Sequence, residues 1–173
     1  NDANALGIGM VHQHFKLVEC FSVLDNIILG VEPNKLGFLQ KAEARKKVVA
    51  LSEKYGLRVD PDALISDISV GMQQRVEILK MLYRDNEILI FDEATSMLDP
   101  KGRREVLAKM KKLRDCGKTV VMITHDVEEA VLADQVILMG RPNGQKDPNT
   151  VLAQGSVREI LTDSRLLIQA GIV

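Results

Sequence analysis

Two adjacent acids, Asp92 and Glu93, follow directly on a run of four apolar residues at positions 88–91. Such a run is typical of a buried strand, and a buried carboxylate is costly unless a cation or hydrogen bonds compensate it. Catalytic residues of open parallel sheets lie at the carboxyl ends of strands. The first acid could hold Mg²⁺ on a nucleotide, and the second could orient or polarise an attacking water. The alternative interpretation is an Asp that caps a turn beside a solvated Glu.

Polar residues also stand at the ends of two other predicted strands. His125 comes directly after the apolar and β-branched run 119–124, and Gln13 ends the run 7–13. A histidine at this edge of the sheet could contact the γ-phosphate of a nucleotide. Gln13 alone carries little information, because a polar residue after a strand is common.

A third feature is a serine and a glycine that stand just before a helical pattern. Ser69 and Gly71 precede apolar residues that recur on one side of the predicted helix, namely Val76, Leu79 and Tyr83. Exposed backbone N–H groups and a hydroxyl at a helix N-terminus can bind an anion. An ordinary serine N-cap explains the same residues.

These positions need an α/β framework to bring them together. Short apolar runs predict strands at 7–13, 87–91, 119–124 and 135–139, with a further short strand near Val151. Asp99 followed by Pro100 predicts the start of a helix that ends before Gly117, so the second and third strands enclose a parallel crossover. From position 22 to position 84 the periodicity is helical. The fold class is therefore α/β, with a parallel sheet and an inserted helical block.

Capping and turn residues predict the remaining boundaries. Gly56 is a helix stop, and Asp126 with Glu129 resembles a capping box. Residues 141–150 (RPNGQKDPNT) have turn chemistry throughout. Two short helices, at 157–161 and 165–170, end the chain.

Composition limits the classes of partner and compartment. The chain has 173 residues with 23 Lys and Arg against 24 Asp and Glu, so its net charge of −1 gives no overall field that favours nucleic acid. The basic run 101–114 is explained by the solvated face of a helix. Cys20 and Cys116 fit neither a disulfide framework nor a metal site, which favours a reducing cytoplasm. No apolar run approaches the ~20 residues needed to cross a bilayer.

The order and spacing of these motifs, over nearly all of the chain, resemble the ATP-binding subunit of ABC transporters. The resemblance implies a partial P-loop NTPase (RecA-like) core with an inserted helical subdomain, and ATP with Mg²⁺ as cofactors. It implies that Asp92 and Gln13 are associated with the magnesium ion, that Glu93 is the catalytic base and that His125 is the switch histidine. Gln13 would be the Q-loop glutamine that senses Mg²⁺ and water.

The same resemblance implies that the site is shared between two ATPase subunits, in a homodimer or a heterodimer. The signature loop, which reaches the γ-phosphate of ATP on the other subunit, would be Ser69, Val70, Gly71, Met72 and Gln73. Ser96 to Asp99 would form the D-loop at the dimer interface. The helical subdomain would meet the transmembrane permease subunits of an importer, which places the protein in the cytoplasm on the inner face of the cell membrane, with no nucleic-acid partner.

The resemblance also divides the chain. Residues 1–20 would be a remnant of the N-terminal core with the Q-loop, and residues 21–84 the helical subdomain with the signature motif. Residues 85–140 would be the RecA-like core, and residues 141–173 a C-terminal loop with short helices.

One motif that the resemblance requires is missing. A phosphate-cradling loop has the pattern G-x-x-x-x-G-K-[ST] between a strand and a helix, and the sequence contains none. The Gly-Lys-Thr at 117–119 lacks the first glycine and precedes a strand. We therefore expect the chain to begin after this loop and to bind ATP weakly or not at all alone. The alternatives are a non-transport ATPase of the same superfamily and a catalytically dead regulatory remnant.

The two halves of the sequence resemble different branches of the family. Residues before the Asp92–Glu93 pair resemble the ATPases of simple-sugar and nucleoside importers. Residues after it resemble the cobalt and energy-coupling-factor ATPases for metal ions and vitamins. The class of transported solute therefore stays open at this point.

Overall fold

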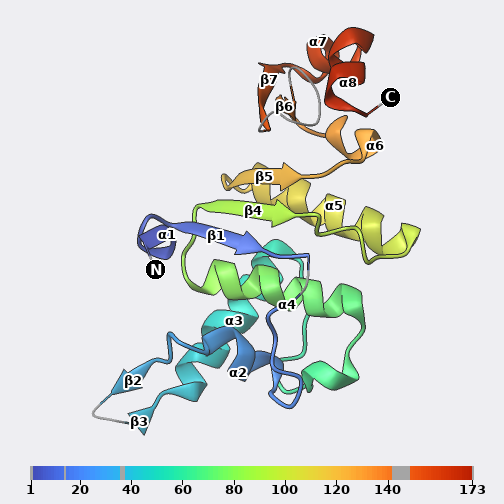
Figure 1. Ribbon diagram of the computed structural model, residues 1–173. Helices are drawn as coiled ribbons and strands as arrows, with labels where there is room; N and C mark the ends of the chain where they lie inside the picture. Colours follow the sequence, from blue (N-terminus) through green and yellow to red (C-terminus); the bar gives the residue numbers. More distant parts are fainter. Residues whose placement is uncertain (1, 14, 36–37, 142–148, 173) are drawn as a thin grey trace. The chain divides into compact units, whose positions relative to one another are not determined.

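A computed structural model of the chain describes residues 2–13, 15–35, 38–141 and 149–172 (Figure 1). The chain forms two compact units, residues 1–123 and residues 124–173. Most of the predicted turn at 141–150 lies outside the described residues. Within the described residues, no helix is both long and apolar enough to cross a membrane.

The first unit is built on a three-stranded parallel sheet. Its strands are β1 (Ile8–Val11), β4 (Ile88–Asp92) and β5 (Thr119–Ile123), in the order β1-β4-β5. Helix α5 (Pro100–Asp115) connects β4 to β5, and Figure 1 shows the three arrows pointing in the same direction. The predicted strands and the predicted crossover are confirmed. The carboxyl ends of the three strands therefore meet at one edge.

Neighbouring strands β1 and β4 are separated in sequence by a helical block. After the short N-terminal helix α1 (Asp2–Ala5) and β1, the block contains α2 (Val23–Ile28), α3 (Lys41–Tyr55), a 3-10 turn (Ile65–Asp67) and α4 (Val70–Tyr83). The structure differs from the sequence prediction at one point, where β2 (Asn34–Lys35) and β3 (Phe38–Leu39) pair antiparallel inside the block. Strands of two residues carry no periodicity that a sequence pattern could reveal.

Helix boundaries follow the predicted capping residues. Asp99 caps α5 by accepting a hydrogen bond from the Gly102 N–H at 2.7 Å, and Pro100 takes the first helical position. Gly56 ends α3 in the left-handed conformation, with φ of 66°.

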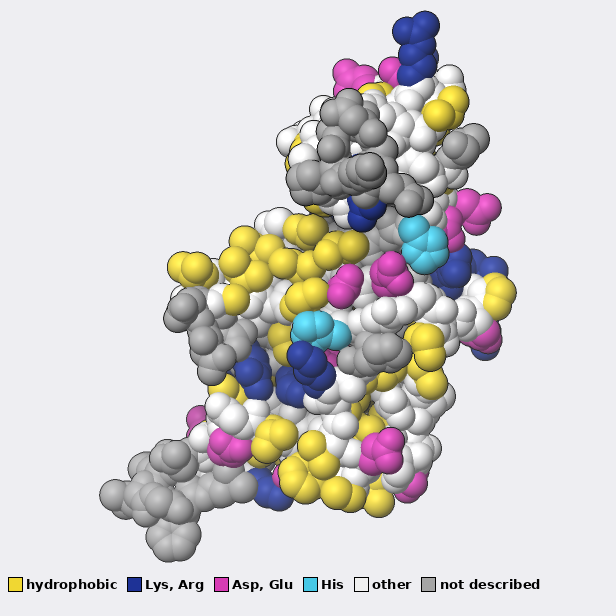
Figure 2. Space-filling model, viewed as in Figure 1, with side chains coloured by type: hydrophobic (Ala, Val, Ile, Leu, Met, Phe, Trp, Pro, Cys, Tyr) yellow, Lys and Arg dark blue, Asp and Glu magenta, His cyan; other side chains and the backbone are white. Residues whose placement is uncertain are grey.

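The two faces of the three-stranded sheet differ in burial. Leu89 and Phe91 are fully buried in the core, whereas Val121 and Ile123 of β5 are exposed. Figure 2 shows hydrophobic side chains gathered over the strands on the visible face. The opposite face packs against the helices, among which α4 contributes Val76 and many other buried residues.

The second unit contains a two-stranded antiparallel sheet and three short helices. These are α6 (Val127–Ala130), β6 (Val136–Gly140), β7 (Thr150–Gly155), α7 (Val157–Leu161) and α8 (Ser164–Ala170). Strands 135–139 and 151 and both C-terminal helices are confirmed, with β7 longer than predicted. Asp126 caps α6 by accepting from the Glu128 N–H, and the Glu129 carboxylate accepts from the Thr124 hydroxyl at 2.8 Å.

Candidate functional site

The two acids lie at the carboxyl end of the central strand. Asp92 is the last residue of β4 and pairs with Ile123 of β5, and both acids are partly buried. The Glu93 N–H donates to the Ile123 carbonyl at 3.0 Å. Glu93 has φ of 45°, a left-handed conformation that an L-residue adopts at a cost of about 1–3 kcal/mol. The sheet therefore ends in a strained turn at the residue predicted to act as a base.

Gln13 reaches the loop that follows the acids. It lies two residues after β1, and its Nε2 donates to the Ser96 hydroxyl at 3.4 Å. The Ser96 hydroxyl in turn donates to the backbone carbonyl of Glu93 at 2.8 Å. The structure thus brings together three residues that the sequence separates by up to 83 positions.

The predicted signature residues form the first turn of α4. Ser69 caps the helix, and its hydroxyl accepts from the Met72 N–H at 3.4 Å, as the ordinary capping interpretation requires. The Met72 and Gln73 N–H groups donate to the Ser69 carbonyl. Val70 is exposed, and a Cβ built on Gly71 would meet no described atom within 4 Å. Packing within the described part of the chain therefore does not require a glycine at this position.

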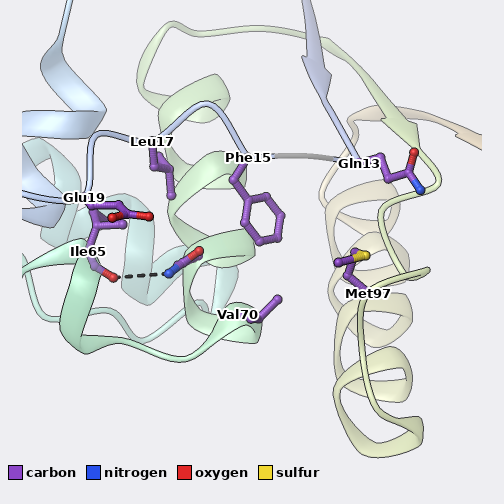
Figure 3. Close-up of a pocket in the computed structure, with 8 residues that line it drawn as sticks. Gln13, Phe15, Leu17, Glu19, Ile65, Val70 and Met97 are labelled. Atoms are coloured by element: carbon purple, nitrogen blue, oxygen red, sulfur yellow. Dashed lines mark hydrogen bonds between the residues drawn. The ribbon is translucent and has the colours of Figure 1, made fainter.

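A cavity of about 270 Å³ connects these motifs (Figure 3). Its wall combines Gln13 with Val70 and Gln73 of α4 and with Met97 of the loop after Glu93. Gln73 Nε2 donates to the Ile65 carbonyl at 3.2 Å, the bond drawn in Figure 3. The complete lining is Gln13, Phe15, Leu17, Glu19, Ile65, Val70, Gln73 and Met97.

Sequence reasoning missed several of the lining residues, among them Phe15 and Leu17, whereas Met97 lies within the predicted D-loop at 96–99. The first two belong to an alternation in which positions 13, 15, 17 and 19 all line the cavity. Alternate residues of an extended segment point to the same side. This period of two was the available signal, although the segment is too irregular to be a strand.

Another missed residue, Gln74, joins α4 to the loop after the acids. Its side chain is fully buried, and Nε2 donates to the Ala94 carbonyl. Its Oε1 is also buried and has no hydrogen-bond partner within the described part of the chain. A buried amide that is only half satisfied is costly, so the bond to Ala94 is the feature that holds this side chain in place.

The two other predicted site residues lie further along the chain. Asp99 is exposed, and its carboxylate caps α5. His125 is exposed, belongs to the second unit and follows two residues after Ile123, the strand partner of Asp92.

The donor set suits Mg²⁺ that is bound together with a nucleotide. Magnesium in such sites is held by one or two carboxylates together with phosphate oxygens and waters. Asp92 and Gln13 offer a carboxylate and an amide oxygen at one edge of the sheet. The described residues contain no group of three or more His, Cys, Asp or Glu side chains that could hold a metal ion.

Comparisons with known proteins identify the family of the chain. The ABC transporter family matches residues 2–96. The nucleoside import ATP-binding protein NupA of Lactococcus lactis subsp. cremoris (strain MG1363) is 55% identical over 137 residues, which cover 79% of this chain and 27% of NupA. The energy-coupling factor transporter ATP-binding protein EcfA1 of Mycoplasma mobile is 39% identical over 147 residues, which cover 84% of this chain and 50% of EcfA1. Relatives of both branches that the sequence resembles are thus found.

A solved structure supports the fold. The structure of cbiO1 from Clostridium perfringens, part of the ABC transporter complex cbiONQ, aligns with a TM-score of 0.69 at 24% identity. The alignment covers 96% of this chain and 63% of that chain. The α/β P-loop NTPase fold predicted from the sequence is confirmed. With more than half of its residues matched by the family, the chain belongs to the ABC transporter family.

Proposed function

We propose that this chain is part of the ATP-binding and ATP-hydrolysing subunit of an ABC importer. The observation that carries the proposal is the hydrogen-bonded link from Gln13 through Ser96 to Glu93 at the end of β4. In this proposal Gln13, which is linked through Ser96 to the Glu93 backbone, would sense the ion and water, and Glu93 would act on the water. Family membership and the names of the relatives support the same activity.

The residues at the carboxyl edge of the sheet would have different roles in ATP hydrolysis. Asp92 and Gln13 would hold Mg²⁺ together with ATP, and the ion supplies neutralisation of the phosphate charge. Glu93, with its N–H fixed on Ile123, would accept a proton from the attacking water. His125 would contact the γ-phosphate.

The first turn of α4 would act on a nucleotide held by a second ATPase subunit. Exposed Ser69 and Val70 and the open space beside Gly71 allow a phosphate to approach the helix N-terminus. Asp99 would lie in the D-loop at the same subunit interface. The subunits would be two copies of one protein or two related proteins.

The helical block between β1 and β4 would meet the transmembrane permease subunits. The protein would then be peripheral on the cytoplasmic face of the cell membrane. Import of a nucleoside is the transport class that we propose, because NupA has the higher identity of the two relatives.

The test of this function is ATP hydrolysis by the protein produced from the complete coding frame, assembled with its permease. We expect Glu93→Gln to lower kcat at least about 100-fold, the scale of a lost general base. The matched control is Glu87→Gln, at the opposite end of the β4 region, where Glu87 is exposed and pairs with Lys118 at 2.8 Å. Unchanged hydrolysis in Glu93→Gln would overturn the assignment of the base. Full-length protein that binds ATP without hydrolysing it would favour a regulatory role instead.

A further inference from the structure

The segment 15–18, which follows Gln13 and forms part of the cavity wall, belongs to no helix or strand. Buried peptide groups need hydrogen-bond partners, which regular structure normally provides. Here side chains of two helices provide them, at every second residue. Figure 3 shows Phe15 and Leu17 on the side of the segment that lines the cavity.

Glu77 and Lys80 of α4 bind both peptide groups of Lys16. Glu77 Oε1 accepts from the Lys16 N–H at 3.0 Å, and Lys80 Nζ donates to the Lys16 carbonyl at 3.1 Å. The side chains of Lys80 and Glu77 are only 11% and 2% exposed, and their charged atoms lie 4.0 Å apart. A buried ion pair that bonds both the N–H and the carbonyl of one residue is a specific clamp on the two peptide units that flank it.

Asn26 of α2 binds the peptide groups of Val18 in the same manner. Its Oδ1 accepts from the Val18 N–H at 2.7 Å, and its Nδ2 donates to the Val18 carbonyl at 3.0 Å. Asn26 is fully buried. Lys16 and Val18 are thus held by helices through their backbone, while the side chains of residues 13, 15, 17 and 19 line the cavity.

The clamp on Lys16 is costly to build, because it removes two charges from water. Burial lowers the pKa of Lys80, while the neighbouring Glu77 carboxylate raises it. Apolar side chains at these two positions would pack in the core without that cost. Packing alone therefore does not explain the pair, whereas fixing the backbone on both sides of Lys16 does.

We propose that Glu77 and Lys80 are positioning residues that fix the segment carrying Gln13 to helix α4. Since Ser69–Gln73 form the first turn of that helix, the clamp also fixes Gln13 relative to the signature residues. Its role in transport rests on the proposed function. The clamp itself can be tested on the chain without nucleotide. The result therefore shows whether the clamp exists, independently of whether the proposed ATPase function is right.

The experiment is amide hydrogen exchange of this chain, measured residue by residue by NMR. In the unmodified chain we expect the Lys16 and Val18 amides to be protected at least about tenfold more than the exposed amides of other irregular segments. Glu77→Leu keeps the packing but removes the acceptor, and should speed exchange at Lys16 about tenfold or more. Glu77→Gln keeps an acceptor oxygen and should restore protection to within about threefold.

The matched control is Lys47→Met, which removes a bond from a lysine to the Tyr83 carbonyl at the other end of α4. It should leave the Lys16 amide unchanged. Equal protection in Glu77→Leu and Glu77→Gln would overturn the proposal, since packing would then be sufficient. If Glu77→Leu does not fold, unprotected Lys16 and Val18 amides in the unmodified chain would overturn it instead.

Discussion

The side-chain amide of Gln13 donates to the hydroxyl of Ser96, 83 residues further along the chain, over 3.4 Å. Because Ser96 also donates to the Glu93 carbonyl, the ends of β1 and β4 are joined outside the sheet as well as within it. A displacement of the Gln13 segment would therefore reach the turn that holds Glu93.

The first prediction concerns Asn26. Its side chain bonds to both the N–H and the carbonyl of Val18, so Asn26→Ala would remove the partners of these two partly buried backbone groups. We expect the free energy of unfolding to fall by about 2–4 kcal/mol in urea denaturation followed by circular dichroism. The exposed Asn149 is the control, and Asn149→Ala should change stability by less than about 0.5 kcal/mol. Equal effects of the two substitutions would contradict the buried network.

The second prediction concerns the strained turn. Glycine adopts a positive φ without the steric cost that alanine has, so Glu93→Gly should be more stable than Glu93→Ala by about 1 kcal/mol. At Asp92, which has ordinary strand geometry, the order should reverse, because glycine weakens a strand. Thermal or urea unfolding of the four variants measures both differences. If Glu93→Ala were at least as stable as Glu93→Gly, the strain at Glu93 would have no energetic weight.

The third prediction concerns Gln74. Gln74→Glu would place a carboxylate against the Ala94 carbonyl in a buried site, and should lower stability by about 3 kcal/mol at neutral pH. In the folded state the pKa of the new carboxyl would be raised, so the loss should shrink as the pH falls and the protonated group donates to Ala94. Gln74→Leu should show no such pH dependence. Urea unfolding at several pH values compares the two variants.

The fourth prediction concerns Asp25, which lies in the first turn of α2. The pKa of Asp25 is lowered mainly by the hydrogen bond that Lys41 donates to its carboxylate at 2.7 Å. The hydrogen bond from the Ser22 hydroxyl lowers it further. A lowered folded-state pKa gives stability that is present above the unfolded value of about 3.9 and is lost as the pH falls through the folded value. Asp25→Asn should therefore reduce stability by about 0.5–1 kcal/mol at pH 7, since the pair is partly exposed, and by less in acid.

Lys41→Met provides the control for Asp25. Removal of this partner should reproduce most of the loss at pH 7, and Asp25→Asn should then have little additional effect. Additive effects of the two substitutions would mean that Asp25 acts through another partner. Both are read from urea midpoints at pH 7 and pH 3.

The sequence predicted the elements of this fold better than the contacts between them. Strands β4 and β5 and the start of α5 follow from apolar runs and from Asp99 with Pro100, because these signals are local. The helical block was predicted without β2 and β3, whose two-residue strands leave no pattern.

The residues that assemble the site were harder to find. Asp92, Glu93 and Gln13 stand at strand ends, where sequence position alone is informative. Glu77, Lys80 and Gln74 lie inside a helix, where charged and amide residues usually face water. Their burial depends on the backbone segments that α4 packs against. Those segments are distant in sequence, so a local pattern cannot predict the contact.

The alternation in residues 13–19 also limits how this part of the gene can change. Irregular segments usually accept inserted or deleted residues. Here, one codon added or lost between Gln13 and Val18 would exchange the residues that line the cavity with those whose backbone is bound by the helices. The backbone of Phe15 or Leu17 would then meet the helices. The Lys16 side chain would face the cavity. Substitutions that keep the length should persist in related genes, whereas changes of length should be rare.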